Sequence, residues 1–177
     1  IPEVGPVLAR NLLAYAGSAK EVFHLRKGKL EKVPGIGPFV AERVAAFDDF
    51  KRVEEQLKFA ENKQIQIIRF HEEAYPQRLK RNHDAPLLLY KQGNADLNAH
   101  RILSIVGTRQ ASEASLTFTE EFVLQLSQMQ CTVVSGLAYG IDIYAHRSAL
   151  KNGIPTIGVL AHGLDKLYPP AHRKTAE

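Results

Sequence analysis

The sequence predicts an α/β fold: a Rossmann-like parallel sheet with helices on both faces, preceded by a small all-helical domain. In about the last seventy-five residues, apolar β-branched runs alternate with stretches of helical periodicity, which is typical of buried parallel strands joined by helices. About the first sixty residues instead hold short helical stretches separated by Pro and Gly. The composition, 45% hydrophobic and 24% charged, is that of an ordinary globular chain.

Residues 1–62 are predicted to form a bundle of short helices, and residues 63–177 the α/β domain. A Pro, Gly, Pro, Ala pattern occurs at residues 1–9 and again, 32 positions later, at residues 33–41. In each copy a turn leads into an apolar helix that begins with proline, where no amide hydrogen is needed. The caps expected in this region are Ser18 at the start of a helix, Gly28 at its end, and Asp48 or Asp49 at the start of the last helix.

The second copy of this pattern is similar to a helix-hairpin-helix motif. Its Gly35 and Gly37 would expose amide groups at a helix N-terminus, where phosphate binds readily, so both are candidate DNA contacts. The alternative is a hairpin that only packs two helices together. In the first copy Glu3 replaces the first glycine, and its carboxylate would repel phosphate.

Five strands and two long helices are expected after residue 62. The first two strands are predicted at residues 64–69 and 86–91. The last three form the parallel unit, and a helix follows each of the first two of these. The strands of this unit are predicted at residues 102–106, 131–134 and 156–161, and the helices at about 112–129 and 141–151.

Polar turns that contain glycine follow the three parallel strands. Ligands of open α/β sheets bind at the carboxyl ends of the strands, and backbone amides in such turns favour anions. Arg109 adds a planar guanidinium that suits a phosphate. The candidate DNA phosphate-binding residues are Gly107, Thr108, Arg109, Ser135, Gly136, Leu137, Ala138 and Gly140, and further candidate contacts are Tyr139, Arg147, Lys151 and His162.

Three more polar residues of these motifs are given structural roles. Asp142 and His146 lie four apart on one helix face; two groups are too few for a zinc site, and we expect His146 to bond to Asp142. Asp165 is also expected to be structural, whereas His162 either lines the pocket or fixes its loop. These residues predict no metal site, and no catalytic residue or cofactor is assigned. Tyr75, Tyr90 and Tyr139 either stack on bases or belong to the core.

Charge and cysteine content narrow the class of protein. The net charge is +4, which is compatible with a polyanionic partner but does not demand one. The basic excess lies in residues 63–101, with seven basic and four acidic side chains, while residues 102–177 hold six of each. The single cysteine, Cys131, excludes an internal disulfide, fits a reducing cytoplasm and is expected to be a small buried side chain. No apolar run is long enough to predict a membrane span.

Together, the motifs resemble the DprA family, also called Smf. The resemblance rests on the three turns, on an Ala-His pair in the second helix and on the Tyr-Pro pair at residues 168–169. It implies a bacterial cytoplasmic protein that binds single-stranded DNA without sequence preference, protects it, and loads RecA during natural transformation, without catalysis. It also implies a homodimer for the full-length protein. Because the family fold continues where this chain stops at Glu177, we expect a chain that lacks part of that fold.

Two other functions stay open. The fold is also similar to that of phosphoribohydrolase-like enzymes, which act on nucleotides in the same crevice, but their Pro-Gly-Gly-x-Gly-Thr signature is absent from these residues. Residues 1–62 could alternatively dock a protein partner.

Overall fold

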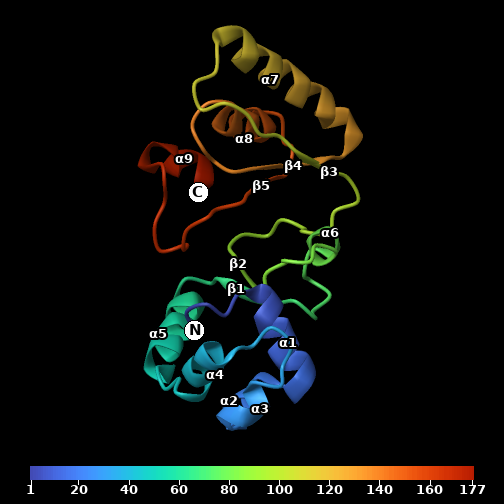
Figure 1. The fold of residues 1–177 in the computed structure, drawn as a ribbon. Helices are drawn as coiled ribbons and strands as arrows, with labels where there is room; N and C mark the ends of the chain where they lie inside the picture. Colours follow the sequence, from blue (N-terminus) through green and yellow to red (C-terminus); the bar gives the residue numbers. More distant parts are fainter. The chain divides into compact units, whose positions relative to one another are not determined.

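The computed structural model describes residues 1–177, which divide into two compact units, residues 1–93 and 94–177 (Figure 1). The first unit holds six helices and a two-stranded hairpin, and the second holds the parallel sheet. The boundary expected after residue 62 separates the helices from the hairpin inside the first unit, and it stays a prediction.

The first unit opens with the predicted bundle of short helices. They are α1 (Pro6–Ala16), α2 (Ala19–His24), α3 (Lys27–Leu30), α4 (Pro38–Ala45) and α5 (Phe50–Asn62). The two copies of the repeat begin α1 and α4 in the same way. Gly5 and Gly37 are the N-caps, both with extended backbone, and a proline follows each of them. The repeat in the sequence is therefore a repeat of local structure.

Side-chain caps fix two of these helices where the sequence placed them. Ser18 Oγ accepts a hydrogen bond from Glu21 N at 3.1 Å, and Asp49 Oδ1 accepts one from Arg52 N at 3.3 Å. The prediction that Gly28 ends the second helix is wrong. That helix already ends at His24, because Leu25 adopts an extended backbone, and Gly28 lies within α3.

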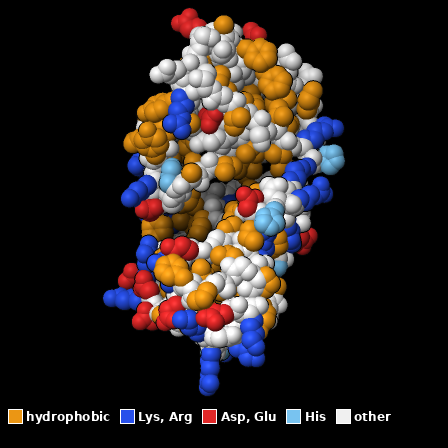
Figure 2. All heavy atoms as spheres, viewed as in Figure 1, with side chains coloured by type: hydrophobic (Ala, Val, Ile, Leu, Met, Phe, Trp, Pro, Cys, Tyr) orange, Lys and Arg blue, Asp and Glu red, His pale blue; other side chains and the backbone are white.

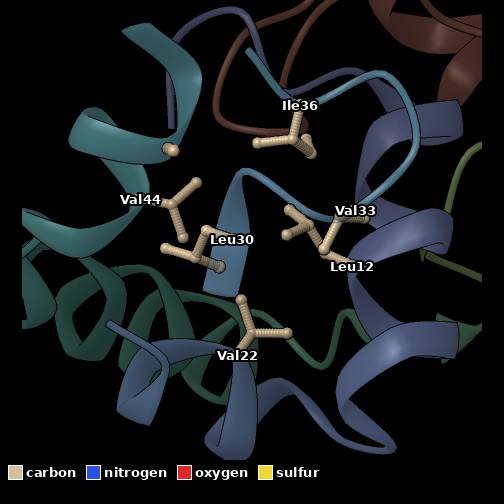
Figure 3. Close-up of a cluster of buried hydrophobic side chains, with 7 residues drawn as sticks. Leu12, Val22, Leu30, Val33, Ile36 and Val44 are labelled. Atoms are coloured by element: carbon tan, nitrogen blue, oxygen red, sulfur yellow. The ribbon is translucent and has the colours of Figure 1, made fainter. Parts of the chain in front are cut away.

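A small apolar core holds the helices together and anchors the hairpin between α3 and α4. Side chains from α1 to α4 converge on Val33 and Ile36, which lie in the hairpin itself (Figure 3). The buried members are Leu12, Val22, Leu30, Val33, Ile36, Ala41 and Val44. The turn is therefore fixed from the inside, while Gly35 and Gly37 stay exposed on its outer side.

A hairpin completes the first unit. Its strands, β1 (Gln66–Arg69) and β2 (Leu88–Lys91), pair antiparallel, and α6 (Gln77–Lys80) lies between them in the sequence. Tyr75, just before α6, is fully buried, and its hydroxyl donates to Pro86 O at 2.7 Å. Burial raises the pKa of Tyr75. Tyr75 is thus a core residue and is not available to stack on a base.

The second unit confirms the predicted parallel α/β arrangement. Strands β3 (Ile102–Ser104), β4 (Thr132–Ser135) and β5 (Thr156–Gly158) pair in that order and in parallel. Helices α7 (Glu113–Leu126) and α8 (Ile141–Lys151) connect them and flank the sheet, and α7 runs into a short 3₁₀ turn, η1 (Ser127–Met129). After β5 come a 3₁₀ turn, η2 (Pro170–His172), and a short helix, α9 (Arg173–Ala176). The first and last strands are shorter than predicted.

The core of this unit lies between the central strand and the two long helices. Val133 of β4 packs with side chains of α7 and α8, and Cys131 is buried there, as the sequence predicted. One side of α7 is less covered, since Phe118 and Phe122 stack on each other at the surface beside a groove of about 640 Å³ along β3. Figure 2 shows apolar side chains gathered over α7. None of the helices combines the length and the apolar character needed to cross a bilayer.

Candidate nucleic-acid interface

The turns that follow β3 and β4 meet at the carboxyl end of the sheet. Ile141 N, at the start of α8, donates to Thr108 O at 3.2 Å, so the second turn is hydrogen-bonded to the first. The turn after β5 joins them, because Val159 N donates to Ser135 O at 2.8 Å. The structure thus brings together the turns that the sequence singled out, at the edge where α/β sheets bind ligands.

Three glycines let these turns approach so closely. A Cβ on Gly140 would lie 2.1 Å from Thr108 O, and Gly140 has a φ of +74°. A Cβ on Gly107 would lie 2.5 Å from Ile141 Cγ1, and one on Gly136 would lie 2.8 Å from Asp142 Oδ2. The sequence suggested these glycines as openings for phosphate, whereas the structure shows that contacts within the protein already require them.

The two hydroxyl groups of the turns have partners inside the protein. Ser135 is buried, and its Oγ donates to Ile105 O at 2.6 Å, which ties β4 to the end of β3. Thr108 is exposed, and its Oγ1 accepts a hydrogen bond from Gln110 N at 3.2 Å, which closes a local turn. The Thr108 hydroxyl can still donate to a ligand, but the Ser135 hydroxyl is committed to Ile105.

Asp142 and His146 are both buried, but they bond to different partners. Asp142 Oδ2 accepts from Gly136 N at 3.1 Å, and His146 Nδ1 lies 2.7 Å from Thr156 Oγ1. The expected hydrogen bond between the two side chains is therefore not formed, because each reaches a different strand end. Burial lowers the pKa of His146, and the nearby Asp142 carboxylate opposes this. Both residues link α8 to the sheet beneath the turns.

Arg109 is the exposed cation of the site. It forms none of the ion pairs of the structure. It borders a cavity of about 160 Å³ together with two exposed tyrosines, Tyr139 (45% exposed) and Tyr168 (65% exposed). The cavity is lined by Arg109, Gly136, Ala138, Tyr139, Leu160, Ala161, His162, Tyr168 and Pro169. The amides of Ala138, Tyr139 and Gly140 donate no hydrogen bond in the structure, and Ala138 and Tyr139 line the same cavity as Arg109.

The other predicted residues divide between the wall of the cavity and its surroundings. His162 lines the cavity, and its Nδ1 lies 3.0 Å from Gly163 O, so it both lines the pocket and holds its loop. Asp165 is exposed, and its carboxylate occupies the space next to Gly163. Arg147 and Lys151 are exposed on α8 and do not line the cavity.

Sequence reasoning did not select two residues that shape this site. Tyr168 forms part of the cavity wall, and the signal that could have found it is the Tyr-Pro pair directly after the third turn. His172 is buried behind the second turn: its Nδ1 donates to Leu137 O at 2.8 Å, and its ring lies edge-on to Tyr139. Leu137 has a φ of +60°, which is unusual for a residue other than glycine, so this bond supports a strained position.

In the first unit, the hairpin between α3 and α4 has one open glycine and one packed glycine. Gly37, the N-cap of α4, has no atom within 4 Å of a built Cβ, whereas a Cβ on Gly35 would lie 2.9 Å from Leu8 Cδ2 of α1. Asn11 of α1 donates to Pro34 O at 2.9 Å and holds the same turn. The hairpin is thus a packing element of the bundle whose exposed edge is at Gly37.

Comparison with known proteins identifies the family. A family model described as DNA recombination-mediator protein A matches residues 66–177. The chain belongs to this family. This confirms the resemblance seen in the motifs, and the match begins near the end of the helical bundle.

Individual members agree with this assignment. The DNA processing protein DprA of Streptococcus pneumoniae is 41% identical over 103 residues, which are 58% of this chain and 36% of that protein. Protein Smf of Synechocystis is 32% identical over 181 residues, which cover 98% of this chain and 45% of that protein. The X-ray structure of the Streptococcus pneumoniae protein matches 97% of this chain and 58% of its own, with a TM-score of 0.75 and 29% identity. The chain therefore spans less than half the length of these two curated relatives.

Proposed function

We propose that this protein binds single-stranded DNA without sequence preference, protects it, and delivers it to the RecA recombinase in recombination and natural transformation. We further propose that it acts in the cytoplasm and that the full-length protein is a homodimer. Membership of a DNA recombination-mediator family supports this proposal. The observation that carries it is the cluster of interlocked turns, with a free Arg109 beside unused amides at the carboxyl edge of the sheet.

In this proposal some groups of the cluster bind the phosphate backbone, and others hold the turns in place. The Arg109 guanidinium binds a phosphate, and the amides of Ala138, Tyr139 and Gly140 donate to its oxygens. Thr108 adds a hydroxyl donor. The residues that keep the turns in place are Gly107, Ser135, Gly136, Leu137, Asp142 and His146. Binding of this kind makes and breaks no covalent bond, so we propose no catalytic step.

The distribution of charge along the chain favours a DNA site on the second unit that depends on a few local contacts. Residues 94–177 hold seven basic and seven acidic side chains, so this unit has no excess charge to attract DNA as a whole. Specific placement must therefore supply the affinity, with His162 at the cavity as a secondary contact and with Arg147 and Lys151, further along α8, as more distant ones. Residues 1–93 hold sixteen basic and twelve acidic side chains. We propose a weaker backbone contact there, at Gly35 and Gly37 of the hairpin.

Fluorescence anisotropy with labelled oligo-dT and a duplex of equal length tests the DNA-binding part. We expect preference for the single strand. Arg109→Ala should weaken binding by about 1–3 kcal/mol, the scale of a hydrogen bond to a charged group. It should also reduce the log–log salt slope by about 0.7, the value for one phosphate of a single strand.

The matched control is Arg101→Ala. Arg101 is exposed in the same unit, but it precedes β3 and donates to Met129 O, away from the turns. Equal effects of the two substitutions, or a salt slope near zero for the unmodified protein, would contradict the proposal. The RecA step is tested separately with the full-length protein, by measuring RecA filament formation on DNA coated with single-strand-binding protein.

A further inference from the structure

We infer that Arg10 and Lys80, held against the ring of Phe70, form a second phosphate-binding site, which lies entirely within the first unit. Arg10 comes from α1, Phe70 directly follows β1, and Lys80 is the last residue of α6. Arg10 Cζ lies 5.4 Å from the centroid of the Phe70 ring, and Lys80 Nζ lies 5.2 Å from the same centroid. The inference rests on the proposed function and adds a binding site on the unit that carries the positive excess.

The ring that gathers the two cations is held in a fixed position. Phe70 N donates to Leu87 O at 2.9 Å, next to the paired strands. The Phe70 ring meets the buried Tyr75 ring with centroids 5.3 Å apart and an angle of 60° between the planes. Arg10, Phe70 and Lys80 are all half-buried. Long cationic side chains lose rotamer freedom when they are held in this way, so the site is organised before any ligand arrives.

The two cations have no acidic partner. None of the ion pairs of the first unit includes Arg10 or Lys80, and the carboxylate of Glu72 is already paired with Arg69. The ring attracts each cation through its quadrupole, but it carries no net charge and does not neutralise them. Salt screens their mutual repulsion only in part, because the Debye length at 0.1 M is about 10 Å. An anion bound beside the ring would relieve this repulsion.

The chemistry of the site favours a phosphate over a base. Phe70 is half-buried and already meets two cations and Tyr75, so its ring is not an open surface for stacking. The Arg10 guanidinium suits two oxygens of a phosphate, and the Lys80 ammonium acts as a point charge. Arg81, exposed directly after α6, can reach a neighbouring phosphate. The site therefore responds to backbone charge and should not distinguish single-stranded from double-stranded DNA.

The test uses the complete chain and fluorescence anisotropy with labelled oligo-dT and a duplex of equal length. Arg10→Gln and Lys80→Gln each remove one charge. Each should weaken binding of oligo-dT about 10-fold, the equivalent of one hydrogen bond to a charged group. Each should also reduce the log–log salt slope by about 0.7, the value for one phosphate of a single strand. Affinity for the duplex should fall by about the same factor, so the preference between the two DNAs should not change.

Three further variants separate placed cations from net charge. Lys58→Gln is the matched control, because Lys58 is exposed on α5 of the same unit, outside the site, and it should leave affinity unchanged. Lys80→Arg keeps the charge and should keep most of the affinity. Phe70→Leu also keeps the net charge, but it should weaken binding because both cations lose the ring that holds them. If Phe70→Leu binds as tightly as the unmodified chain, the role of the ring is overturned.

The outcomes separate this inference from the proposed function. If Arg109→Ala weakens binding while the Arg10 and Lys80 variants behave like Lys58→Gln, the proposed site at the turns stands and the second site is overturned. If only the Arg10 and Lys80 variants weaken binding, the second site stands and the site at the turns fails. A lower thermal midpoint with unchanged affinity would show that the two cations only stabilise the fold, and would overturn the inference.

Titration calorimetry with tripolyphosphate covers a chain that binds no DNA. In that case the proposed function fails. Tripolyphosphate binding that both glutamine variants weaken would still support a phosphate site at Arg10 and Lys80, filled by free phosphate chains instead of DNA. Absence of such binding would overturn the second site as well.

Discussion

Gly140 is the residue on which the contact between the first two turns most depends. Its φ of +74° disfavours any other residue, and Thr108 O fills the space of a Cβ. Gly140→Ala should lower the free energy of unfolding by about 3 kcal/mol or more, since left-handed strain of about 1–2 kcal/mol adds to a steric clash. Gly153→Ala is the control: it has a φ of +67° but open space, and should cost only about 1–2 kcal/mol. Equal losses in urea unfolding would show that the turns do not meet as described.

His146 should make stability depend on pH. Burial places its folded pKa below the ordinary value of 6.5, so the unfolded chain binds more protons in the window between the two values. The free energy of unfolding should therefore fall as the pH drops below about 6.5. Thermal unfolding between pH 5.5 and 7.5 should show a smaller decrease for His146→Gln than for the unmodified protein. The exposed His83 provides the control, and a His83→Gln variant should behave like the unmodified chain.

Helix starts were predictable because they depend on local chemistry. Ser18 and Asp49 accept bonds from amides three residues ahead, and a proline can open a helix wherever a turn precedes it. The end predicted at Gly28 was wrong because a glycine in the sequence does not show that a helix reaches it. The sequence therefore predicted where these helices begin better than where they end.

Helical periodicity predicted α5 but not what covers it. Phe50, Val53 and Leu57 recur on one side of this helix, yet all three are largely exposed, and only Ala60 is buried. The period depends on the sequence alone, whereas burial depends on which neighbours are present. The same holds for Phe118 on α7, which fits the helical pattern and lies at the surface.

The helical bundle gives a direct test of this difference between periodicity and burial. Leu30 is completely buried, whereas Leu57 is 52% exposed. Leu30→Ala should reduce the free energy of unfolding by about 2–5 kcal/mol, because it removes packed atoms and leaves a cavity. Leu57→Ala should change it by about 0.5 kcal/mol or less. Similar losses in chemical denaturation would mean that the core is centred elsewhere.

Over the whole molecule, charge and the candidate site are separated. The entire excess of +4 belongs to residues 1–93, while the unit that carries the candidate site is neutral. Figure 2 shows basic and acidic side chains interspersed over the helices of the first unit rather than segregated. If the proposed function holds, long-range attraction of DNA and local contact with it are supplied by different parts of the chain, and affinity at the turns depends on a few placed groups.

The sequence by itself determined the family, the parallel α/β class and the place of the three turns, because strand periodicity and turn residues are local properties. The sequence also placed Arg109 in the first of these turns, and its role in binding phosphate stays a prediction. Tertiary structure alone decided that Ser135 uses its hydroxyl internally, that Asp142 and His146 bond to different strands, and that Tyr168 and His172 shape the cavity around Tyr139. These contacts join residues from separate segments, and the type of a residue does not show which distant atom it will meet when the chain folds.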